Sequence, residues 1–338
     1  MSQKSRIVRL AVILPPDKAR KIKLADRISY LCQERNIEVS DIDVQKTDQI
    51  GGKYDVLIHK ALDFYNEPGV TAEEGDNLVR KVLDFIKSNP QMVVIDDPVS
   101  SEKISDRKNC HEIMMSSTMI KNGIEVFVPK SVEIPDGLTV QEIRDFLHCT
   151  NVKFPIIAKP MQTNDKQMSM IFSLDDVAAI RPPSLVQEFF NHSGVMYKVF
   201  VIGDRYHIIQ RPSIKNYATD PNQKPIYIDS RDVSKMGRGF HPHIHHSDPS
   251  KQTWRNSFDN PDLLDKLVVS ELCKNLKRSS GLQLYGVDIL VLKETGNYAI
   301  VDINQFPGYK GIPDRIFADD IVEMILQNSV CENKQNER

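Results

Sequence analysis

Two β-rich runs near the end of the chain carry acidic side chains that could bind a metal ion. Residues 284–304 read LYGVDILVLKETGNYAIVDIN, and the ETG at 294–296 predicts a hairpin turn. With the turn centred there, Asp288 lies opposite Asp302, and Asn304 points from the same face. Opposed carboxylates repel, so a divalent cation between them is the natural compensation, and this all-oxygen set suits Mg²⁺. Solvated acids on an ordinary hairpin are the simpler alternative.

Two lysines in apolar strands could neutralise phosphate charge. Lys159 ends the apolar run 154–159, and Lys198 lies inside the predicted strand 196–202. A charge within an apolar strand faces a cleft or an ion-pair partner, and phosphoryl transfer depends on cations placed around the transferred group. A structural or surface role remains open for each lysine alone.

Three further segments give weaker signals. The run LVQEFF at 185–190 could present backbone polar groups to an adenine edge and enclose its ring. Near the N-terminus, four basic residues lie at the start of a predicted helix: Lys18, Arg20, Lys21 and Lys23. A phosphate could bind there, although a solvated helix face explains such runs equally well. The cluster His241–His246 could hold zinc only with ligands that the sequence does not supply, so we expect an exposed loop there.

Alternating strand-like and helix-like segments must position these side chains. The first hundred residues predict an α/β unit with a largely parallel sheet, with segments Ile7–Leu14, Lys18–Arg35, Ile37–Asp43, Val56–His59, Asn77–Ser88 and Val93–Ile95. Next come two helices, at 106–115 and 139–148. The strands of this part are at 126–128, 155–159, 168–172, 185–189, 196–202 and 205–210. Residues 213–261 read as irregular loops, and 262–279 as a helix stopped by Gly281.

These segments predict four parts of the chain. We expect an N-terminal α/β, Rossmann-like domain at 1–106 and a strand-rich unit at 107–190. A further unit at 191–330 carries the acidic hairpin, and 331–338 reads as a polar tail.

Composition narrows the class of protein. The 338 residues are 40% hydrophobic and 27% charged, which fits a globular protein and excludes collagen-like or wholly disordered chains. The net charge of -2 gives no global attraction to nucleic acid or an anionic membrane. The apolar runs are too short to cross a bilayer, the N-terminus lacks a signal-peptide layout, and the five cysteines are scattered. We therefore expect a cytoplasmic monomer with reduced thiols.

Several motifs, in order, resemble one family. They extend over about residues 6–330 and include Leu57–Lys60, Asp106-Arg107, Ile156–Pro160, Gln187–His192, Tyr197–Phe200, Gln210–Ser213, Asp229–Lys235, Asp288 and Val301–Gly308. The chain resembles the inositol 1,3,4-trisphosphate 5/6-kinases, also called inositol-tetrakisphosphate 1-kinases, which have the ATP-grasp fold. The resemblance implies two ATP-grasp subdomains, at 107–190 and 191–330, that clamp ATP between them.

The resemblance also implies roles for individual residues. ATP would contact Arg107, Lys159, Gln187, Glu188, Phe189, Lys198, Ser213, Ser230 and Ser234. Magnesium would be held by Asp288, Asp302 and Asn304. The inositol phosphate would contact Lys21, Lys60, Lys166, Lys198, Arg211, Asn304 and Gly308, with Lys198 and Arg211 acting in catalysis. In the loop 161–167, where animal relatives have glycine and a substrate-binding histidine, this chain has no glycine and carries Lys166.

The implied reaction is direct transfer of the ATP γ-phosphoryl group to a free hydroxyl of an inositol tris- or tetrakisphosphate. Three phosphates carry roughly -5 to -6 of charge, which needs concentrated local cations in a protein of net charge -2. The partners are then ATP and soluble inositol polyphosphates. Two alternatives are an ATP-grasp carboxylate–amine ligase, which activates an acid as an acyl phosphate, and a non-catalytic ATP-binding module.

Overall fold

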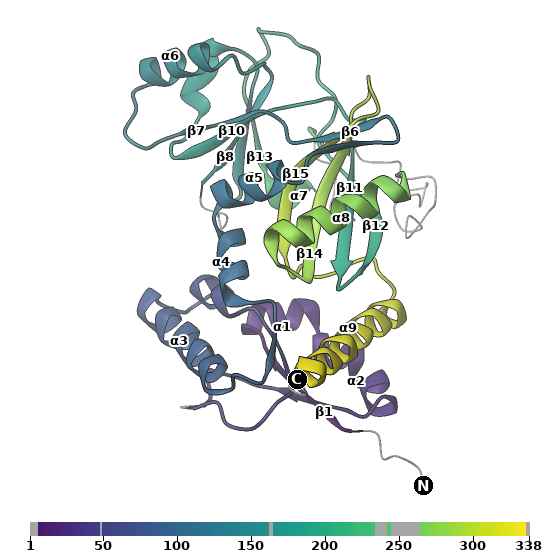
Figure 1. Ribbon diagram of the computed structural model, residues 1–338. Coiled ribbons are helices and arrows are strands. Elements are labelled where there is room, and N and C mark those ends of the chain that lie inside the picture. Colours follow the sequence, from purple (N-terminus) through teal and green to yellow (C-terminus); the bar gives the residue numbers. More distant parts are fainter. Residues whose placement is uncertain (1–5, 48, 162–164, 234–241, 245–263, 336–338) are drawn as a thin grey trace.

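The computed structural model describes residues 6–47, 49–161, 165–233, 242–244 and 264–335. Within these ranges the strands form three sheets, each accompanied by helices. The N-terminal sheet occupies one end of the molecule, and the other two sheets lie side by side at the opposite end (Figure 1). The predicted α/β class is confirmed.

The N-terminal sheet is parallel, with strand order β2-β1-β3-β4. Its strands are β1 (Val8–Ile13), β2 (Ile37–Asp41), β3 (Val56–His59) and β4 (Val93–Ile95), and its helices include α2 (Leu24–Glu34), the 3₁₀ helix η1 (Ala61–Asn66) and α3 (Ala72–Ser88). Leu10 and Val12 pack on the side of α2, whereas Ala11 and Ile13 pack on the side of α3. This alternation follows from the two-residue period of a strand buried on both faces.

The single helix predicted over 18–35 is wrong, because the structure divides it in two. Helix α1 (Pro16–Ile22) ends at Lys23, which adopts a left-handed conformation with φ of 51°, and α2 begins at Leu24. The Lys23 amide still donates to the carbonyl of Ala19. Lysine gives no sequence signal for such a break, since glycine or asparagine normally supplies it.

Helix α9 (Asp314–Gln335) returns to the N-terminal domain, so the chain closes back on its beginning (Figure 1). Phe317 lies under the guanidinium of Arg27 at 3.6 Å from its ring centre, and Arg27 Nε donates to Asp314 over 2.7 Å. The helix continues to Gln335, so most of the segment predicted as a polar tail is helical. The expected limits of the N-terminal unit therefore omit a helix that belongs to its core.

The central sheet is antiparallel, with strand order β13-β9-β8-β10-β7. Its strands are β7 (Ser131–Ile134), β8 (Ile156–Pro160), β9 (Gln167–Ile171), β10 (Ser184–Glu188) and β13 (Ile226–Asp229), and it carries α6 (Val140–Thr150) and η2 (Leu174–Ala179). Strand β13 comes from the stretch predicted as irregular. It pairs with a strand far away in the chain, which local sequence patterns do not reveal.

The third sheet has the order β12-β11-β14-β15-β6-β5. Its strands are β5 (Met119–Lys121), β6 (Ile124–Phe127), β11 (Val195–Ile202), β12 (Arg205–Pro212), β14 (Leu284–Val291) and β15 (Tyr298–Gln305). Helix α8 (Lys266–Ser280) covers it, and α4 (Pro98–Ser105) and α5 (Arg107–Met115) lead to it from the N-terminal domain (Figure 1). Because β5 and β6 join this sheet and β13 joins the central one, the predicted limits at 107 and 190 do not separate the sheets.

Two local expectations concern turns and thiols. The two-residue turn Gly203-Asp204 joins β11 to β12, with Gly203 at a φ of 62°, as the sequence predicts.

Cys32, Cys110 and Cys273 are buried and Cys149 is exposed, all as free thiols. No helix in the described ranges has the length and apolar character to cross a bilayer.

Candidate active site

A cavity of about 350 Å³ lies between the central sheet and the third sheet. It collects residues from both sheets, from the start of α5 and from the short helix α7 (Ser230–Val233) that follows β13. The predicted ATP residues that line it are Arg107, Lys159, Gln187, Glu188, Phe189, Lys198, Ser213 and Ser230, together with Lys166 and the predicted metal ligands Asp288, Asp302 and Asn304. Ser234 lies outside the described residues.

The acidic hairpin has the register that the sequence predicts at its functional positions. Asp288 on β14 pairs directly with Asp302 on β15. Nearer the turn, Ile289 pairs with Ile300, so Val301 is an extra residue that bulges from β15. At this bulge the carbonyl of Val301 accepts a hydrogen bond from Lys159 Nζ at 3.2 Å.

The donor set of this hairpin fits a hard divalent cation. Asp288 is buried, and its Oδ1 lies 2.5 Å from Lys198 Nζ. Burial raises the pKa of Asp288 and the facing Asp302 raises it further, whereas Lys198 lowers it. Asn304 donates from Nδ2 to Asp302 Oδ2 over 2.9 Å, which orients the amide beside the carboxylates. Two opposed carboxylates beside an amide oxygen are the kind of oxygen ligands that Mg²⁺ prefers.

Lys159 is held beneath the phosphate side of the cavity. Its Nζ donates to Gln187 Oε1 over 2.7 Å and to the Val301 carbonyl. Burial lowers the pKa of Lys159 to about 8, although Asp302 and Asp288 oppose that shift and Arg107 adds to it. A buried amine with neutral partners gains most when an anion arrives, because the anion restores the stability of its charged form.

Part of the cavity lining is apolar, which would suit a nucleotide base. Ile157, Met168, Phe189, Met196, Ile214 and Leu290 line it. His192 closes one end, with its ring 5.5 Å from that of Phe189 and its Nε2 2.8 Å from Ser213 Oγ. The backbone N–H groups of Glu188 and Phe189 donate to the carbonyls of Lys130 and Pro155, so these two amides are not available to adenine. The segment 187–189 therefore contributes its side chains and carbonyl groups.

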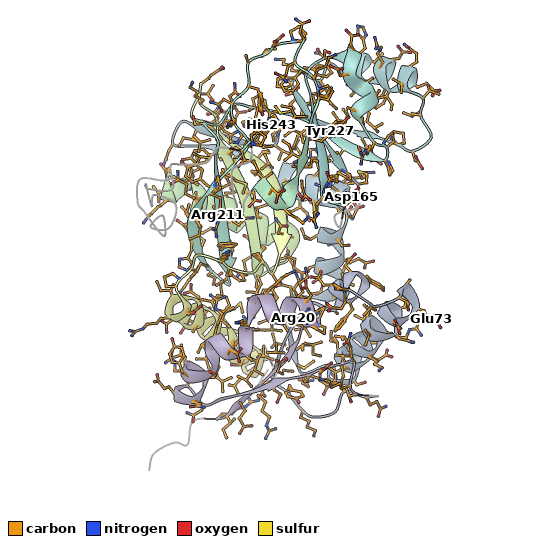
Figure 2. The ribbon with its side chains drawn as sticks, turned by 180° about the vertical axis from the view of Figure 1, so that it is seen from behind. Arg20, Glu73, Asp165, Arg211, Tyr227 and His243 are labelled. Carbon is orange, nitrogen blue, oxygen red and sulfur yellow. The ribbon has the colours of Figure 1, made fainter. Side chains whose placement is uncertain are left out.

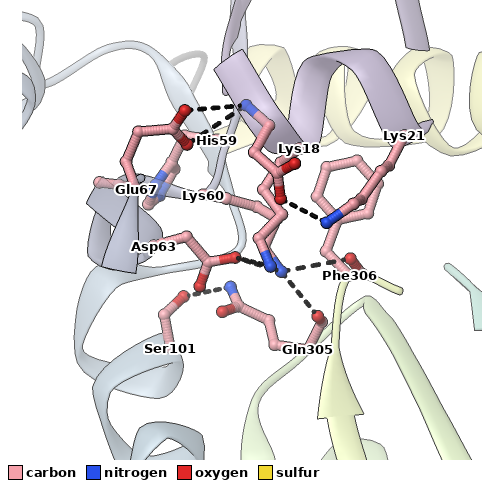
Figure 3. A network of polar contacts seen from close by, with 11 residues as sticks. Lys18, Lys21, His59, Lys60, Asp63, Glu67, Ser101, Gln305 and Phe306 are labelled. Carbon is pink, nitrogen blue, oxygen red and sulfur yellow. Dashed lines mark hydrogen bonds and ion pairs between the residues drawn. The ribbon is translucent and has the colours of Figure 1, made fainter. Parts of the chain in front are cut away.

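The N-terminal basic cluster is arranged differently from the expectation. Lys21 forms an ion pair with Asp17 on its own helix, whereas Lys18 Nζ lies 3.3 Å from Asp63 Oδ2. The start of α1 is not open to a phosphate, because the Asp17 amide donates to the Glu67 carboxylate at 3.1 and 3.2 Å. Both lysines lie near Lys60 (Figure 3), but only Lys18 shares the Asp63 carboxylate with it.

Lys60 lies in a buried polar network between the N-terminal domain and the loop after β15. Its Nζ is 2.9 Å from Asp63 Oδ2 and donates to the carbonyl of Gln305 over 3.1 Å. Figure 3 shows the amino groups of Lys18 and Lys60 converging on Asp63. Burial lowers the pKa of Lys60, and Asp63 opposes that shift. Lys60 therefore ties two domains together at the edge of the predicted acceptor site.

Lys166 faces the same space from the central sheet. It is half-buried, and its carbonyl accepts from the amide of Ser230 at 2.8 Å. Burial lowers the pKa of Lys166, Asp302 opposes the shift, and three nearby cations add to it, namely Arg107, Lys18 and Arg231. Side chains from all three parts of the fold thus share one electrostatic environment.

Arg211 and Gly308 lie behind this space and outside the lining of the cavity. Arg211 is buried, donates to the carbonyl of Lys310, and has a pKa lowered by burial, which Asp288 opposes. Arg211 packs closely against Gly311, because a side chain at position 311 would place its Cβ atom 3.2 Å from Arg211 Nη2. Gly308 is exposed with open space beside its Cα. Their roles toward an inositol phosphate remain predictions.

Sequence reasoning missed two residues of the site. Arg231 carries charge near Lys166, and His192 closes the apolar pocket. Lys18 was named in the N-terminal basic run but was not singled out from its neighbours on the same helix. His241, His245 and His246 lie outside the described residues, and the Nδ1 of His243 lies 2.7 Å from the Tyr217 hydroxyl.

The two sheets that close on the cavity, with an acidic hairpin at its floor, define an ATP-grasp protein. Solved structures of this class cover nearly the whole chain. An ATP-grasp ligase from Chryseobacterium gregarium, associated with ribosomal peptides and solved with ADP and peptides, has a TM-score of 0.61 at 11% identity and covers 95% of this chain and 97% of its own. A D-alanine–D-alanine ligase from Bacillus anthracis has a TM-score of 0.52 at 14% identity and covers 98% and 100%. At this identity the likeness shows the fold.

Sequence comparisons give the family. Residues 12–100 match the inositol 1,3,4-trisphosphate 5/6-kinase pre-ATP-grasp domain, and residues 120–327 match the ATP-grasp domain of the same kinases. An inositol-tetrakisphosphate 1-kinase of Danio rerio is 31% identical over 308 residues, covering 89% of this chain and 75% of its own. One of Xenopus laevis is 29% identical, covering 87% and 72%. The chain belongs to the inositol 1,3,4-trisphosphate 5/6-kinase family.

Proposed function

We propose that the protein is an inositol phosphate kinase that transfers the γ-phosphoryl group of ATP to a free hydroxyl of an inositol tris- or tetrakisphosphate. Family membership supports the reaction class. The single observation that carries the acceptor is the gathering of cations in one cavity. Arg107, Lys166 and Lys198 come to it from separate parts of the chain, and Lys18 of the N-terminal domain is near enough to lower the pKa of Lys166. Cations gathered from separate domains suit a ligand with several phosphate groups.

We assign the floor of the cavity to ATP and its metal ion. Arg107, Lys159 and Lys198 would hold the ATP phosphates, and Ser213 and Ser230 would contact the nucleotide. Asp288, Asp302 and Asn304 would hold Mg²⁺, which offsets phosphate charge when bound. Lys198, already ion-paired at the hairpin, would neutralise the charge that develops during transfer, and Arg211 would support it from behind.

We assign the side toward the N-terminal domain to the acceptor. Lys166 and Lys18 would bind its phosphates directly, while Lys60 would position the loop that begins at Gln305 and leads to Gly308. Lys18 is added to the predicted Lys21 in this assignment, because Lys18 and not Lys21 is among the charges that act on Lys166. A magnesium-dependent monomer is what we expect in solution.

The competing activity is a carboxylate–amine ligase, since the structural relatives named above are ligases of the same fold. ATP consumption should be measured with inositol tris- and tetrakisphosphates and, in parallel, with a panel of amino acids and short peptides. We expect turnover with the inositol phosphates alone, and phosphorus NMR should show one added phosphomonoester on the ring. Acceptor-dependent ATP hydrolysis with amino acids only would contradict the proposal.

A further inference from the structure

Arg231 is a cavity-lining cation that the family resemblance does not assign. It lies in α7, directly after β13, and lines the cavity. Strand β13 pairs with β9 so that Asp229 is opposite Gln167, and the amide of Ser230 donates to the carbonyl of Lys166. Arg231 and Lys166 are thus at the same end of two neighbouring strands. Figure 2 shows this end near Asp165, on the side of the central sheet that faces the N-terminal domain.

The guanidinium of Arg231 is held on one side only. Its Nε lies 3.0 Å from both carboxylate oxygens of Asp229, and its Nη2 lies 2.5 Å from Asp229 Oδ2. The amide of Arg231 also donates to Asp229, over 2.8 Å. Among the described residues, Nη1 has no hydrogen-bond partner. Because a guanidinium has five donors in a planar fork, Asp229 can fix its orientation while the other edge remains open to an anion.

Arg231 is held by acids, because Asp229 and, more weakly, Asp232 raise its pKa, whereas the cations of this end of the cleft gather around Lys166. The three other cations that share this space are Lys166, Lys18 and Arg107, and their mutual influence is seen at Lys166, where they oppose its charged form. Asp302 is the acidic group that acts on Lys166 from the metal site. Like charges brought together from separate segments repel unless a polyanion lies between them.

We propose that Arg231 binds a phosphate of the acceptor beside Lys166, so that an acceptor with a phosphate at this end of the cleft binds more tightly than one without it. The inference rests on the proposed function. It differs from the assignment of Lys166, because it adds a cation that reaches the cleft from the other strand. An extra phosphate adds about -1.5 to -2 of charge, so it gains most from a second cation at this end of the cleft.

The position of Arg231 favours an acceptor contact over a nucleotide contact. The proposed ATP contact Lys198 is 16% exposed at its side chain and is ion-paired with Asp288 at the hairpin, and Lys159 is held by Gln187. The Arg231 side chain is 62% exposed. Through Lys166 it shares its environment with Lys18, which belongs to the N-terminal domain. The ligand that touches that domain is the acceptor in the proposed function.

The test compares Arg231→Gln and Arg231→Lys with Arg144→Gln as a matched control. Arg144 is also an arginine of the central subdomain paired with an aspartate, Asp175 at 3.0 Å, but it lies on α6, and it is not among the residues that line the cavity. For Arg231→Gln we expect the KM for an inositol tetrakisphosphate to rise about tenfold, the size of one lost charge-assisted hydrogen bond. The KM for a trisphosphate should rise less, and the KM for ATP should not change.

Each outcome decides one question. Arg231→Lys should recover part of the loss, because lysine keeps the charge without the planar fork. If Arg231→Gln behaves like the control, or if its main effect is on the KM for ATP, the role in acceptor binding is wrong while the kinase activity stands. If the parent protein phosphorylates neither inositol phosphate, calorimetric binding of both ligands to parent and Arg231→Gln separates the two ideas. Equal binding to both proteins, or binding to neither, overturns the Arg231 proposal.

Discussion

The two sides of the cleft hold their cations in different ways. On the nucleotide side, Lys159 and Lys198 are fixed by short contacts to Gln187 and Asp288. On the side proposed for the acceptor, Lys18 and Arg231 are 36% and 62% exposed and are paired with Asp63 and Asp229. A rigid, desolvated floor suits a nucleotide that is always the same, and a wetter rim suits acceptors that differ in phosphate number.

The largest expected effect concerns the metal site on the nucleotide side. Asp302→Asn keeps the shape of the hairpin but removes one anionic ligand, so initial rates at saturating Mg²⁺-ATP should fall by about a thousandfold. The metal-free protein should be no less stable, because the repulsion between Asp288 and Asp302 is relieved.

Asp175→Asn, at an exposed carboxylate on the central subdomain, is the control and should keep its activity. Near-parental rates for Asp302→Asn would rule out the metal assignment. A melting temperature far below that of the parent without metal would make Asp302 a structural hydrogen-bonding residue.

The second prediction separates two lysines of the N-terminal domain. Lys60→Met should lower the free energy of unfolding by about 2 kcal/mol, because it removes a largely buried ammonium with its ion pair to Asp63 and its hydrogen bonds to the carbonyls of Gln305 and Phe306, while Asp63 keeps its contact with Lys18. Lys18→Met should cost less than about 1 kcal/mol, since Lys18 forms a partly exposed ion pair. Urea unfolding measures both. Equal losses would show that Lys60 does not tie the domains together.

Salt should affect the two sides unequally. The Debye length falls from about 30 Å at 0.01 M salt to about 8 Å at 0.15 M. Acceptor affinity should therefore drop severalfold over this range, because Lys18 and Arg231 are exposed to screening. Affinity for the nucleoside of ATP, measured with adenosine, should not change. An acceptor affinity independent of salt would remove the contrast between the two sides.

The smallest expected effect is the uptake of a proton by Lys159 when ATP binds. Burial gives the folded protein a Lys159 with a pKa of about 8, against an ordinary value of 10.5. Between pH 8 and 10.5 the Lys159 side chain binds more protons in the unfolded chain than in the folded protein. This group therefore makes the ligand-free protein more stable as pH rises from 8 to 10.5. ATP should restore the charge, so binding at pH 9 should take up close to one proton. Calorimetry in buffers of different ionisation enthalpy measures it, and Lys159→Met should abolish the uptake.

Much of the nucleotide side could be predicted from the sequence, because it depends on local patterns. The hairpin gave the pairing of Asp288 with Asp302, and the apolar strand marked Lys159. The bulge at Val301 could not be foreseen, although it supplies the carbonyl that holds Lys159. A single extra residue in a strand leaves no distinct signature in alternating apolar residues.

The acceptor side was harder to predict because it is assembled from distant segments. Lys18 and Lys21 lie on one short helix, and they differ in the acid that each contacts: Lys18 pairs with Asp63, about 45 residues further along the chain, and Lys21 with Asp17 on its own helix. Arg231 follows β13, which pairs with β9 across about sixty residues of chain, as in Asp229 opposite Gln167. Long-range pairing of this kind is decided by packing, and a single sequence does not display it.

The contrast between the two sides is tested most directly by crossed calorimetric titrations. Lys159→Met and Lys18→Met would each be titrated with a non-hydrolysable ATP analogue and with an inositol tetrakisphosphate. We expect Lys159→Met to lose about tenfold or more in affinity for the ATP analogue alone, and Lys18→Met to lose affinity for the inositol phosphate alone. Equal losses of both ligands in both variants would contradict a cleft with separate nucleotide and acceptor sides.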